Sequence, residues 1–274
     1  MPAKLYVVGT PLGNLDDLTP RAARTLAEAD VIACEDTRRT GRLLERIGVR
    51  KPLVSYHEHN EESRAAELVR RVEAGETVAL VSDAGMPLVS DPGYRLVRAA
   101  IDAGVDVVPI PGPDAATTAL VVSGLPVDAY RFCGFLPAKS TQRRKALDAL
   151  ATDPATLVIY EAPHRIVRTL TDALEILGDR KAALARELTK LHEEVVRGSL
   201  SAIFADFSAR ENIRGEMVLV IAPGEAPPVA DIPLPERVAA LIDEGVPRMD
   251  AIKQAARERG ISKRDAYRLL EQTS

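Results

Sequence analysis

Short apolar runs that end abruptly in Gly- and Pro-rich segments recur along the first half of the chain. The clearest is Val78–Val81, which is followed at residues 82–93 by a segment rich in Ser, Asp, Gly and Pro. Such a run predicts a buried strand that stops in a loop. The same pattern occurs at residues 5–14 and 105–114. One loop of this kind would indicate only a turn. Three of them predict a shared edge where parallel strands end, which is where open α/β sheets bind ligands.

Helical patterns separate these strands. Thr19 followed by Pro20 predicts a helix start, with a helix over residues 20–29. Apolar runs and amphipathic patterns predict further elements in alternation, namely strands at residues 31–34 and 53–56 and helices through residues 65–72 and 94–103. Five strands alternating with helices before residue 111 predict a largely parallel α/β domain, which we place at residues 1–124.

The pattern changes after residue 124, where short steps between strands are mixed with helices. The predicted elements are strands near residues 131–136, 156–160, 182–187, 194–198 and 217–222 and a helix near residues 165–177. This mixture predicts a second, α+β domain at residues 125–223 rather than an extension of the parallel sheet.

Proline sets the C-terminal residues apart. Residues 224–235 are rich in proline and predict a linker, followed by a small helical module at residues 236–274. Within the module, apolar periodicity predicts helices over Met249–Arg259 and Lys263–Gln272, with Ser262 capping the second. We therefore expect a helix-turn-helix-like pair at the end of the chain.

Composition limits the classes of protein that remain. The chain has 274 residues, of which 46% are hydrophobic and 28% charged, as in an ordinary soluble globular protein. Its two cysteines, Cys34 and Cys133, exclude a disulfide framework and a four-thiolate metal site. There is no apolar run of membrane-spanning length and no signal-peptide pattern, so we expect a cytoplasmic protein without a membrane partner. The net charge of −4 argues against non-specific coating of nucleic acid, but it is compatible with a local basic face.

The three loops lack the common nucleotide-binding signatures. Gly9 to Gly13 reads G-x-x-x-G, and neither G-x-G-x-x-G nor G-x-x-x-x-G-K-[ST] occurs in the chain. Loops of Gly, Ala, Pro and Met suit a mostly apolar ligand held by backbone groups, with which an adenosyl cofactor is compatible. His57 and His59 could begin a metal site, but no third ligand follows at a recognisable spacing, so we predict no metal.

Charged residues stand out where predicted strands end, a place that chains usually fill with neutral polar residues. They are Glu35, Asp36, Arg38, Glu161, Arg165, Arg186 and Glu187. Basic residues also cluster in two places, at Lys139, Arg143, Arg144 and Lys145 and at Arg257, Arg259, Lys263, Arg264 and Arg268. Ion pairs at the rim of a sheet and solvated helix faces are the alternatives. The common location of the first set at strand ends favours a charged site. The two basic clusters, one of them on the helical module, favour phosphate binding.

Seven motifs occur in order along the chain, namely Val8–Leu15, Ala33–Arg38, Ser82–Gly93, Pro111–Ala115, Gly134–Pro137, Tyr160–Arg165 and Arg186–Lys190. Together they resemble the motifs of a family of ribosomal RNA small-subunit methyltransferases within the tetrapyrrole methylase superfamily. The resemblance extends over nearly the whole chain, including the helical module. Where tetrapyrrole methylases read Gly-Asp-Pro, this chain reads Gly85-Met86-Pro87, so a contact made by that Asp side chain does not carry over.

The resemblance implies a tetrapyrrole methylase-like fold of two α/β domains with S-adenosylmethionine bound between them, and a homodimer. It also implies 2′-O-methylation of a decoding-centre cytidine in 16S rRNA, which we expect on the assembled 30S subunit. By matching loops, the cofactor-binding residues would be Pro11, Ser82, Asp83, Ala84, Gly85, Met86, Pro87, Pro111, Gly112, Asp114, Ala115 and Glu161.

A ribose hydroxyl becomes a good nucleophile only when a base or acceptor draws off its proton. Our candidates for that role are Glu35, Asp36 and Glu187, which follow predicted strands within the resembling motifs. The candidates for contact with RNA are Arg38, Lys139, Arg143, Arg144, Arg165, Arg186, Lys263 and Arg264.

Two other functions are weighed against this one. A methylase of a small tetrapyrrole would use the same cofactor cleft, but it leaves the helical module and the basic clusters without a role. A ligand-sensing DNA-binding regulator would use the module as its reader, and would need a two-fold partner and a strongly basic recognition helix.

Overall fold

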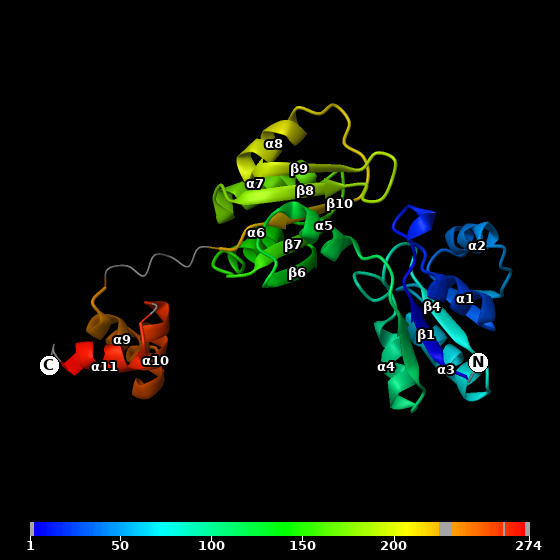
Figure 1. The fold of residues 1–274 in the computed structure, drawn as a ribbon, viewed down its shortest axis with the longest axis horizontal. Helices are drawn as coiled ribbons and strands as arrows, with labels where there is room; N and C mark the ends of the chain where they lie inside the picture. Colours follow the sequence, from blue (N-terminus) through cyan, green and yellow to red (C-terminus); the bar gives the residue numbers. More distant parts are fainter. Residues whose placement is uncertain (1–2, 225–231, 260, 272–274) are drawn as a thin grey trace. The chain divides into compact units, whose positions relative to one another are not determined.

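The computed structural model describes residues 3–224, 232–259 and 261–271, and these residues form two compact units. The first unit contains two five-stranded sheets with their helices. The second contains three C-terminal helices together with residues 152–154. Figure 1 shows the elements of both units in sequence colours.

The first sheet is parallel throughout, as the alternation of strands and helices predicted. Its strands, in spatial order, are β3 (Leu53–Ser55), β2 (Val31–Cys34), β4 (Val78–Val81), β1 (Leu5–Val8) and β5 (Val107–Ile110). The three inner strands are buried at every position, which explains why they read as continuous apolar runs. Since all five strands run the same way, the loops that follow them meet at one edge of the sheet.

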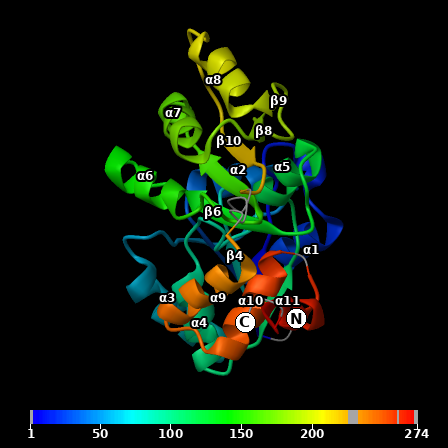
Figure 2. The same cartoon turned by 90° about the vertical axis from the view of Figure 1, so that its left-hand side faces the viewer.

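Helices cover both faces of this sheet (Figure 2). The helices α1 (Pro20–Glu28) and α2 (Thr37–Arg46) pack on one face, and α3 (Glu61–Glu73) and α4 (Tyr94–Asp102) pack on the other. A short 3-10 helix, Leu15–Asp17, precedes α1. The predicted start of α1 is confirmed, because the Thr19 hydroxyl accepts a hydrogen bond from the Ala22 amide at 3.1 Å.

The second sheet is mixed. Its strands, in spatial order, are β6 (Tyr130–Phe135), β7 (Thr156–Glu161), β10 (Met217–Ile221), β8 (Lys181–Arg186) and β9 (Glu194–Ser199). Only β6 and β7 pair in parallel, and the other pairs are antiparallel. The five strands predicted after residue 124 are therefore all present, within two residues of their expected ends.

Both faces of the second sheet are also covered. The helices α6 (Ser140–Asp148), α7 (Ile166–Leu177) and α8 (Leu200–Ser208) pack on one face, and α5 (Ala115–Ser123) packs on the other. The expected boundary at residue 124 groups α5 with the first sheet, whereas its buried residues Ala116, Ala119 and Leu120 pack on the second. The helix therefore follows the first sheet in sequence but belongs to the core of the second.

The C-terminal helices α9 (Leu234–Asp243), α10 (Arg248–Glu258) and α11 (Lys263–Glu271) form a small core of their own. The predicted cap of α11 is confirmed, since the Ser262 hydroxyl accepts from the Asp265 amide at 3.1 Å. The expected linker at 224–235 extends too far, because Leu234 and Pro235 already belong to the first turn of α9, where proline is tolerated. Residues 225–231 of that linker lie outside the described residues.

Across the described ranges, no helix is both long and apolar enough to span a bilayer.

Candidate active site

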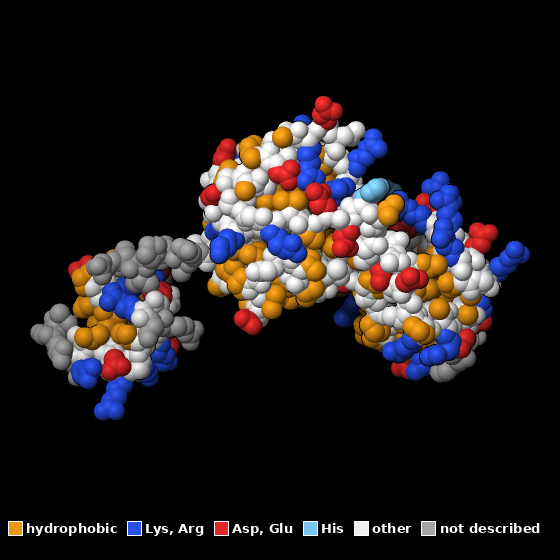
Figure 3. Space-filling model, turned by 45° about the horizontal axis from the view of Figure 1, so that its top comes forward, with side chains coloured by type: hydrophobic (Ala, Val, Ile, Leu, Met, Phe, Trp, Pro, Cys, Tyr) orange, Lys and Arg blue, Asp and Glu red, His pale blue; other side chains and the backbone are white. Residues whose placement is uncertain are grey.

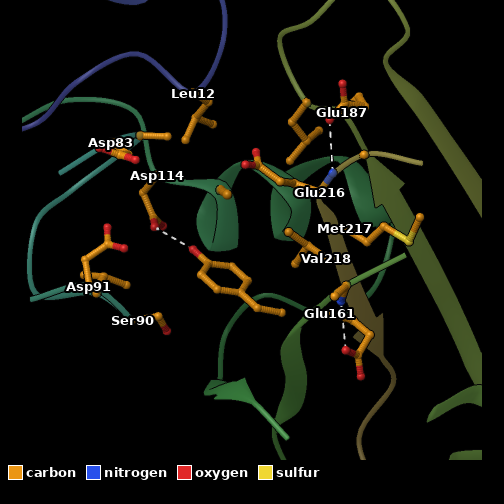
Figure 4. Close-up of a pocket in the computed structure, with 18 of the residues that line it drawn as sticks. Leu12, Asp83, Ser90, Asp91, Asp114, Glu161, Glu187, Glu216, Met217 and Val218 are labelled. Carbon is orange, nitrogen blue, oxygen red and sulfur yellow. Dashed lines mark hydrogen bonds between the residues drawn. The ribbon is translucent and has the colours of Figure 1, made fainter. Parts of the chain in front are cut away.

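A cavity of about 590 Å³ lies where loops of the first sheet face strands β7, β8 and β10 of the second. Figure 4 shows Leu12, Asp83, Asp91 and Asp114 on the side of the first-sheet loops and Glu216, Met217 and Val218 on the side of the second sheet. The lining residues are Leu12, Glu35, Arg39, Asp83–Met86, Val89–Asp91, Asp114, Ala115, Phe135, Tyr160–Pro163, Ala185, Glu187, Leu188, Lys190 and Gly215–Val218.

The repeated Gly- and Pro-rich loops of the first sheet are joined to one another by backbone contacts. Thr10 and Gly85 exchange two backbone hydrogen bonds, of 2.9 and 3.0 Å. Gly9 and Gly112 pack so closely that a Cβ atom on Gly112 would lie 2.8 Å from the Gly9 carbonyl carbon. These glycines let three strand-end loops meet without side chains between them.

Backbone strain is concentrated in two segments that line the cavity. Among the described non-glycine residues, a positive φ occurs at Leu88 (71°), Ser90 (65°), Glu187 (52°) and Thr189 (65°). Such conformations cost free energy and persist where the surroundings hold them, most often at functional sites. Both strained segments belong to the motifs that the sequence analysis selected.

An ion-pair network fixes the second-sheet side of the cavity. The Lys190 ammonium lies 2.9 Å from both the Glu187 and the Glu216 carboxylates, and the Glu216 amide donates to Glu187 at 3.0 Å. Burial is the largest single influence and opposes ionisation of Glu187, but the hydrogen bonds from Lys190 and the Glu216 amide, together with the charges of Lys190 and Arg186, outweigh it and lower the pKa of this carboxyl. The Asn14 amide donates to the Thr189 hydroxyl at 3.2 Å, which ties the segment to the loop after β1.

The cavity is acidic. Seven carboxylates line it against two cations, Arg39 and Lys190: Glu35, Asp83, Asp91, Asp114, Glu161, Glu187 and Glu216. Most of the seven are neutralised or hydrogen-bonded within the protein. Asp83 pairs with Arg39 at 3.2 Å, and Asp114 caps α5 by accepting from the Thr117 amide at 2.8 Å.

Two carboxyls of the cavity have a raised pKa. Burial, followed by the negative charge of Glu35, raises the pKa of Asp91 to about 6. Burial and the charge of Asp83 raise the pKa of Glu35 as well, although Arg39 opposes the shift. These two groups therefore take up protons closer to neutral pH than ordinary carboxyls do.

Of the three expected catalytic residues, the structure places two at the cavity and one outside it. Glu35 and Glu187 line the cavity. Asp36 does not, because its carboxylate caps α2 through the Arg38 amide at 2.8 Å and pairs with the Arg38 guanidinium at 2.8 Å. These interactions hold the pKa of Asp36 well below its usual range, so its role as a base is corrected to that of a helix cap.

The expected cofactor residues divide in the same way. Asp83, Ala84, Gly85, Met86, Asp114, Ala115 and Glu161 line the cavity, whereas Pro11, Ser82, Pro87, Pro111 and Gly112 do not. The Ser82 hydroxyl supports the loop by donating toward the Ala84 and Gly85 carbonyls, each at 3.2 Å. The side chain of Glu161 is buried, bonded to the Ala162 amide and paired with Arg165, so its carboxylate is held by groups of the fold (Figure 4).

Three basic residues expected to contact RNA are engaged inside the protein. The side chain of Arg143 is only 4% exposed and pairs with Asp172 at 2.6 Å, and Arg144 pairs with the same carboxylate at 3.0 Å. Arg165 is 17% exposed and joins Glu161 to the Leu136 carbonyl. Arg143 and Arg165 are therefore held in ion pairs of the fold, which does not favour their predicted contact with RNA. Lys139, Lys263 and Arg264 are exposed, and Arg38 is exposed beside Asp36.

Arg186 lies instead in a second cavity of about 320 Å³ that shares Glu187 and Gly215 with the first. Its other lining residues are His192, Arg210, Asn212, Ile213 and Arg214. Glu194 holds Arg186 at 3.0 Å and Arg210 at 2.8 Å. This cavity is basic, in contrast to the first.

Several site residues were not found from the sequence. Ser90, Asp91 and Phe135 lie in motifs that the sequence analysis quoted, where the abrupt end of a strand was the available signal. Gly215 and Glu216 precede an ordinary buried strand and carried no signal at all. In the part of the chain that the structure describes, no group of three or more His, Cys, Asp or Glu side chains could hold a metal ion.

A model of the family "Tetrapyrrole (Corrin/Porphyrin) Methylases" matches residues 4–203, which contain both sheets except β10 and most of the cavity lining. The chain belongs to the tetrapyrrole methylase family.

Curated relatives of this tetrapyrrole methylase share its full extent. A protein of Halalkalibacterium halodurans is 49% identical, with 98% of this chain and 94% of the relative covered, and one of Escherichia coli O157:H7 is 45% identical, with 98% and 95% covered. Both are named "Ribosomal RNA small subunit methyltransferase I". The fold is also that of the uroporphyrin-III C-methyltransferase of Thermus thermophilus, solved with S-adenosyl homocysteine. The TM-score is 0.55 at 24% identity, over 79% of this chain and 96% of that one.

Proposed function

We propose that this methylase transfers a methyl group from S-adenosylmethionine to the 2′-hydroxyl of a decoding-centre cytidine in 16S rRNA, on the assembled small subunit. The observation that carries the proposal is the acidic cavity at the strand ends of a chain whose curated relatives are named as ribosomal RNA small-subunit methyltransferases. We further propose a homodimer that acts in the cytoplasm.

The residues of the cavity suit this cofactor. Ala115, Met217 and Val218 offer an apolar surface for an adenine ring, beside the aromatic pair Phe135 and Tyr160, whose ring centroids are 5.6 Å apart. The surrounding carboxylates favour a ligand with positive charge, as a sulfonium and an ammonium group provide. The backbone of Asp83–Met86, held open by the positive φ of Gly85, can approach the ligand closely.

S-adenosylmethionine, when bound, supplies an electrophilic methyl group on its sulfonium. The protein's part is to hold the ribose hydroxyl in line with that methyl group and to accept the proton that the hydroxyl loses. Alignment of the two reactants can contribute several kcal/mol of the acceleration. The fixed segments at Thr10–Gly85 and Glu187–Lys190 supply the rigidity that alignment requires.

The second cavity suits the RNA backbone. The guanidinium groups of Arg186, Arg210 and Arg214, with His192, present donors suited to a phosphodiester beside the acidic cavity. Lys139, Lys263 and Arg264 are further candidates, and the basic side chains of the C-terminal module are visible in Figure 3. We propose that the module docks on the ribosomal subunit, since phosphate contacts position a protein without reading sequence.

A surface for a second copy of the chain is available beside the edge strand β6. Val127 and Tyr130 are exposed by 51 and 46%, and exposed apolar side chains near an unpaired strand edge favour association. These residues support the proposed homodimer, which sedimentation of the purified protein would test.

The proposed function is tested by transfer of labelled methyl from S-adenosylmethionine to 30S subunits, to naked 16S rRNA and to a porphyrinoid. We expect alkali-resistant label at one cytidine of the 30S subunit, because 2′-O-methylation blocks cleavage at that ribose. Label on the porphyrinoid alone would contradict the proposal and establish a small tetrapyrrole as the substrate.

A further inference from the structure

Methylation of a hydroxyl leaves a proton that must be taken up, and the acidic cavity offers seven carboxylates for the purpose. This inference rests on the proposed function, and it asks which of the seven can accept the proton. A proton acceptor must face the cavity and must have lone pairs that no cation or buried donor already occupies.

Five of the seven carboxylates fail this requirement. Glu187 and Glu216 share the Lys190 ammonium, at 2.9 Å each. Asp83 is paired with Arg39 and also accepts from the Asp36 amide at 3.2 Å.

The other two are occupied by hydrogen bonds of the fold. Asp114 accepts from the Thr117 amide and hydroxyl, both at 2.8 Å, and from the Tyr160 hydroxyl at 3.4 Å. Glu161 is buried and bonded to the Ala162 amide, the Thr169 hydroxyl and Arg165.

Glu35 and Asp91 remain, and among the described residues neither forms an ion pair. The positive charge of Arg39 lowers the pKa of Glu35, but the Arg39 guanidinium is itself paired with Asp83 at 3.2 Å. Asp91 has no cation among the groups that act on it. These are the negative charges of Glu35, Asp83 and Glu216, and the hydroxyl of Ser82.

The backbone fixes Asp91 at the cavity wall. Asp91 follows Ser90, which has a positive φ of 65°, and the non-glycine residue Leu88 of the same segment also has a positive φ. Asp91 precedes Pro92 and Gly93. Figure 4 shows its side chain on the same side of the cavity as Asp83 and Asp114. A side chain held on a strained, Pro-bounded segment is presented in a defined position, which an acceptor in a catalysed step requires.

We propose that Asp91 is the proton acceptor of the methyl transfer. As the ribose oxygen forms its bond to the methyl carbon, the bond between that carbon and sulfur breaks, and its electron pair stays on sulfur. The hydroxyl proton passes to the Asp91 carboxylate and is released to water after the product leaves. Glu35 assists by keeping the acceptor basic through its negative charge, without touching the proton.

The electrostatics of the cavity suit this role. Burial and then the charge of Glu35 raise the pKa of Asp91 to about 6, so it is ionised at neutral pH and is a stronger base than an ordinary carboxylate. The Tyr160 hydroxyl donates to Asp114 at 3.4 Å, and burial, followed by the charge of Asp114 and more weakly that of Asp91, raises the pKa of Tyr160, so the phenol stays protonated.

The test compares the full-length chain with Asp91→Asn, Asp91→Glu and Glu35→Gln on 30S subunits in single-turnover assays with saturating cofactor. We expect the Asp91→Asn rate to fall by about 10²- to 10⁴-fold and its dependence on pH near 6 to disappear. Asp91→Glu keeps a carboxylate and should retain that dependence. Glu35→Gln should shift the dependence to lower pH, because it removes a neighbouring negative charge.

A readout without turnover accompanies the rates. With the aspartate carboxyl carbons labelled with ¹³C, the resonance that Asp91→Asn removes should titrate in the unliganded protein with a midpoint near 6, and lower in Glu35→Gln. Asp102→Asn is the matched control, since Asp102 pairs with Arg98 on α4 and does not line the cavity. It should change neither the rate nor the midpoint.

An Asp91→Asn rate within about threefold of the unmodified chain, or a resonance midpoint near 4, would overturn the role of Asp91 alone. Absence of transfer to 30S subunits by the unmodified chain would instead overturn the proposed function, and the role of Asp91 with it.

Discussion

The two neighbouring cavities differ in how their charges are compensated. In the basic cavity, Glu194 binds both Arg186 and Arg210, and the hydrogen bond from Arg210, followed by that from Arg186, lowers the pKa of Glu194 to about 2. In the acidic cavity, Glu35 and Asp91 form no ion pair among the described residues, although the charge of Arg39 acts on Glu35. In the basic cavity, Arg186 and Arg210 are therefore paired before any ligand binds, whereas the acidic cavity keeps two carboxylates that form no ion pair and that a cationic ligand can neutralise.

The largest expected effect comes from disrupting the glycine contact that supports the loops of the acidic cavity. A Cβ at residue 112 would lie 2.8 Å from the Gly9 carbonyl carbon, so Gly112→Val must push apart the loops after β1 and β5. We expect cofactor affinity, measured by calorimetry, to fall at least about 100-fold, and the free energy of unfolding to fall by about 1–3 kcal/mol. The basic cavity should be unaffected.

Gly41→Ala is the matched control for this change. Residue 41 lies within α2, where a Cβ would make only an ordinary contact of 3.9 Å with Leu53. It should leave affinity unchanged and stabilise the helix by roughly 0.5–1 kcal/mol. Affinity in Gly112→Val equal to that of the unmodified chain would show that the close approach of these loops does not shape the cofactor site.

The acidic cavity was largely predictable as a location, because buried parallel strands read as apolar runs and their ends are marked by Gly and Pro. The individual residues that line the cavity were less predictable from the sequence. Helix α5 is apolar on most of its surface and has no clear amphipathic period, and α2, although amphipathic, buries only Thr40 and Leu44. Neither helix was predicted, so nothing in the sequence identified Asp36 and Asp114 as their N-caps.

The basic residues show a second limit of sequence reasoning. Arg143 and Arg144 form a cluster in the sequence, but their shared partner is Asp172, on the next helix. Arg186, Arg210 and Arg214 are distributed over a strand end and a loop, and they form a cavity only when α8 returns the chain to β10. Charge clusters in a sequence do not reveal which charges the fold neutralises.

The second prediction concerns the free energy of unfolding that is lost because the carboxylate of Asp91 is buried without an ion pair. Because the pKa of Asp91 is raised to about 6, the carboxyl of this residue binds more protons in the folded than in the unfolded chain between about pH 4 and 6. The contribution of Asp91 to the free energy of unfolding should therefore fall as the pH rises through that window, by about 1–3 kcal/mol.

The substitution Asp91→Asn should remove this loss of stability at high pH, because the amide does not ionise. We expect the variant to unfold in urea at a higher concentration than the unmodified chain at pH 8 and to lose the advantage at pH 4, although it is the slower enzyme. An ordinary surface carboxylate would give no such crossing. Lower stability of Asp91→Asn at both pH values would show that Asp91 stabilises the fold rather than straining it.

The smallest effect is expected in the basic cavity. Arg214 is exposed and its recorded side-chain partner is the neutral Asn212, at 3.4 Å, so Arg214→Ala removes one cation without breaking an ion pair. We expect affinity for 30S subunits to fall about 3- to 10-fold and the slope of log affinity against log salt to decrease by about 1. Affinity for the cofactor should be unchanged. Arg98→Ala, an exposed arginine on α4 that lines neither cavity, should alter neither quantity. An equal loss in both variants would mean that general charge, and not the basic cavity, attracts the RNA.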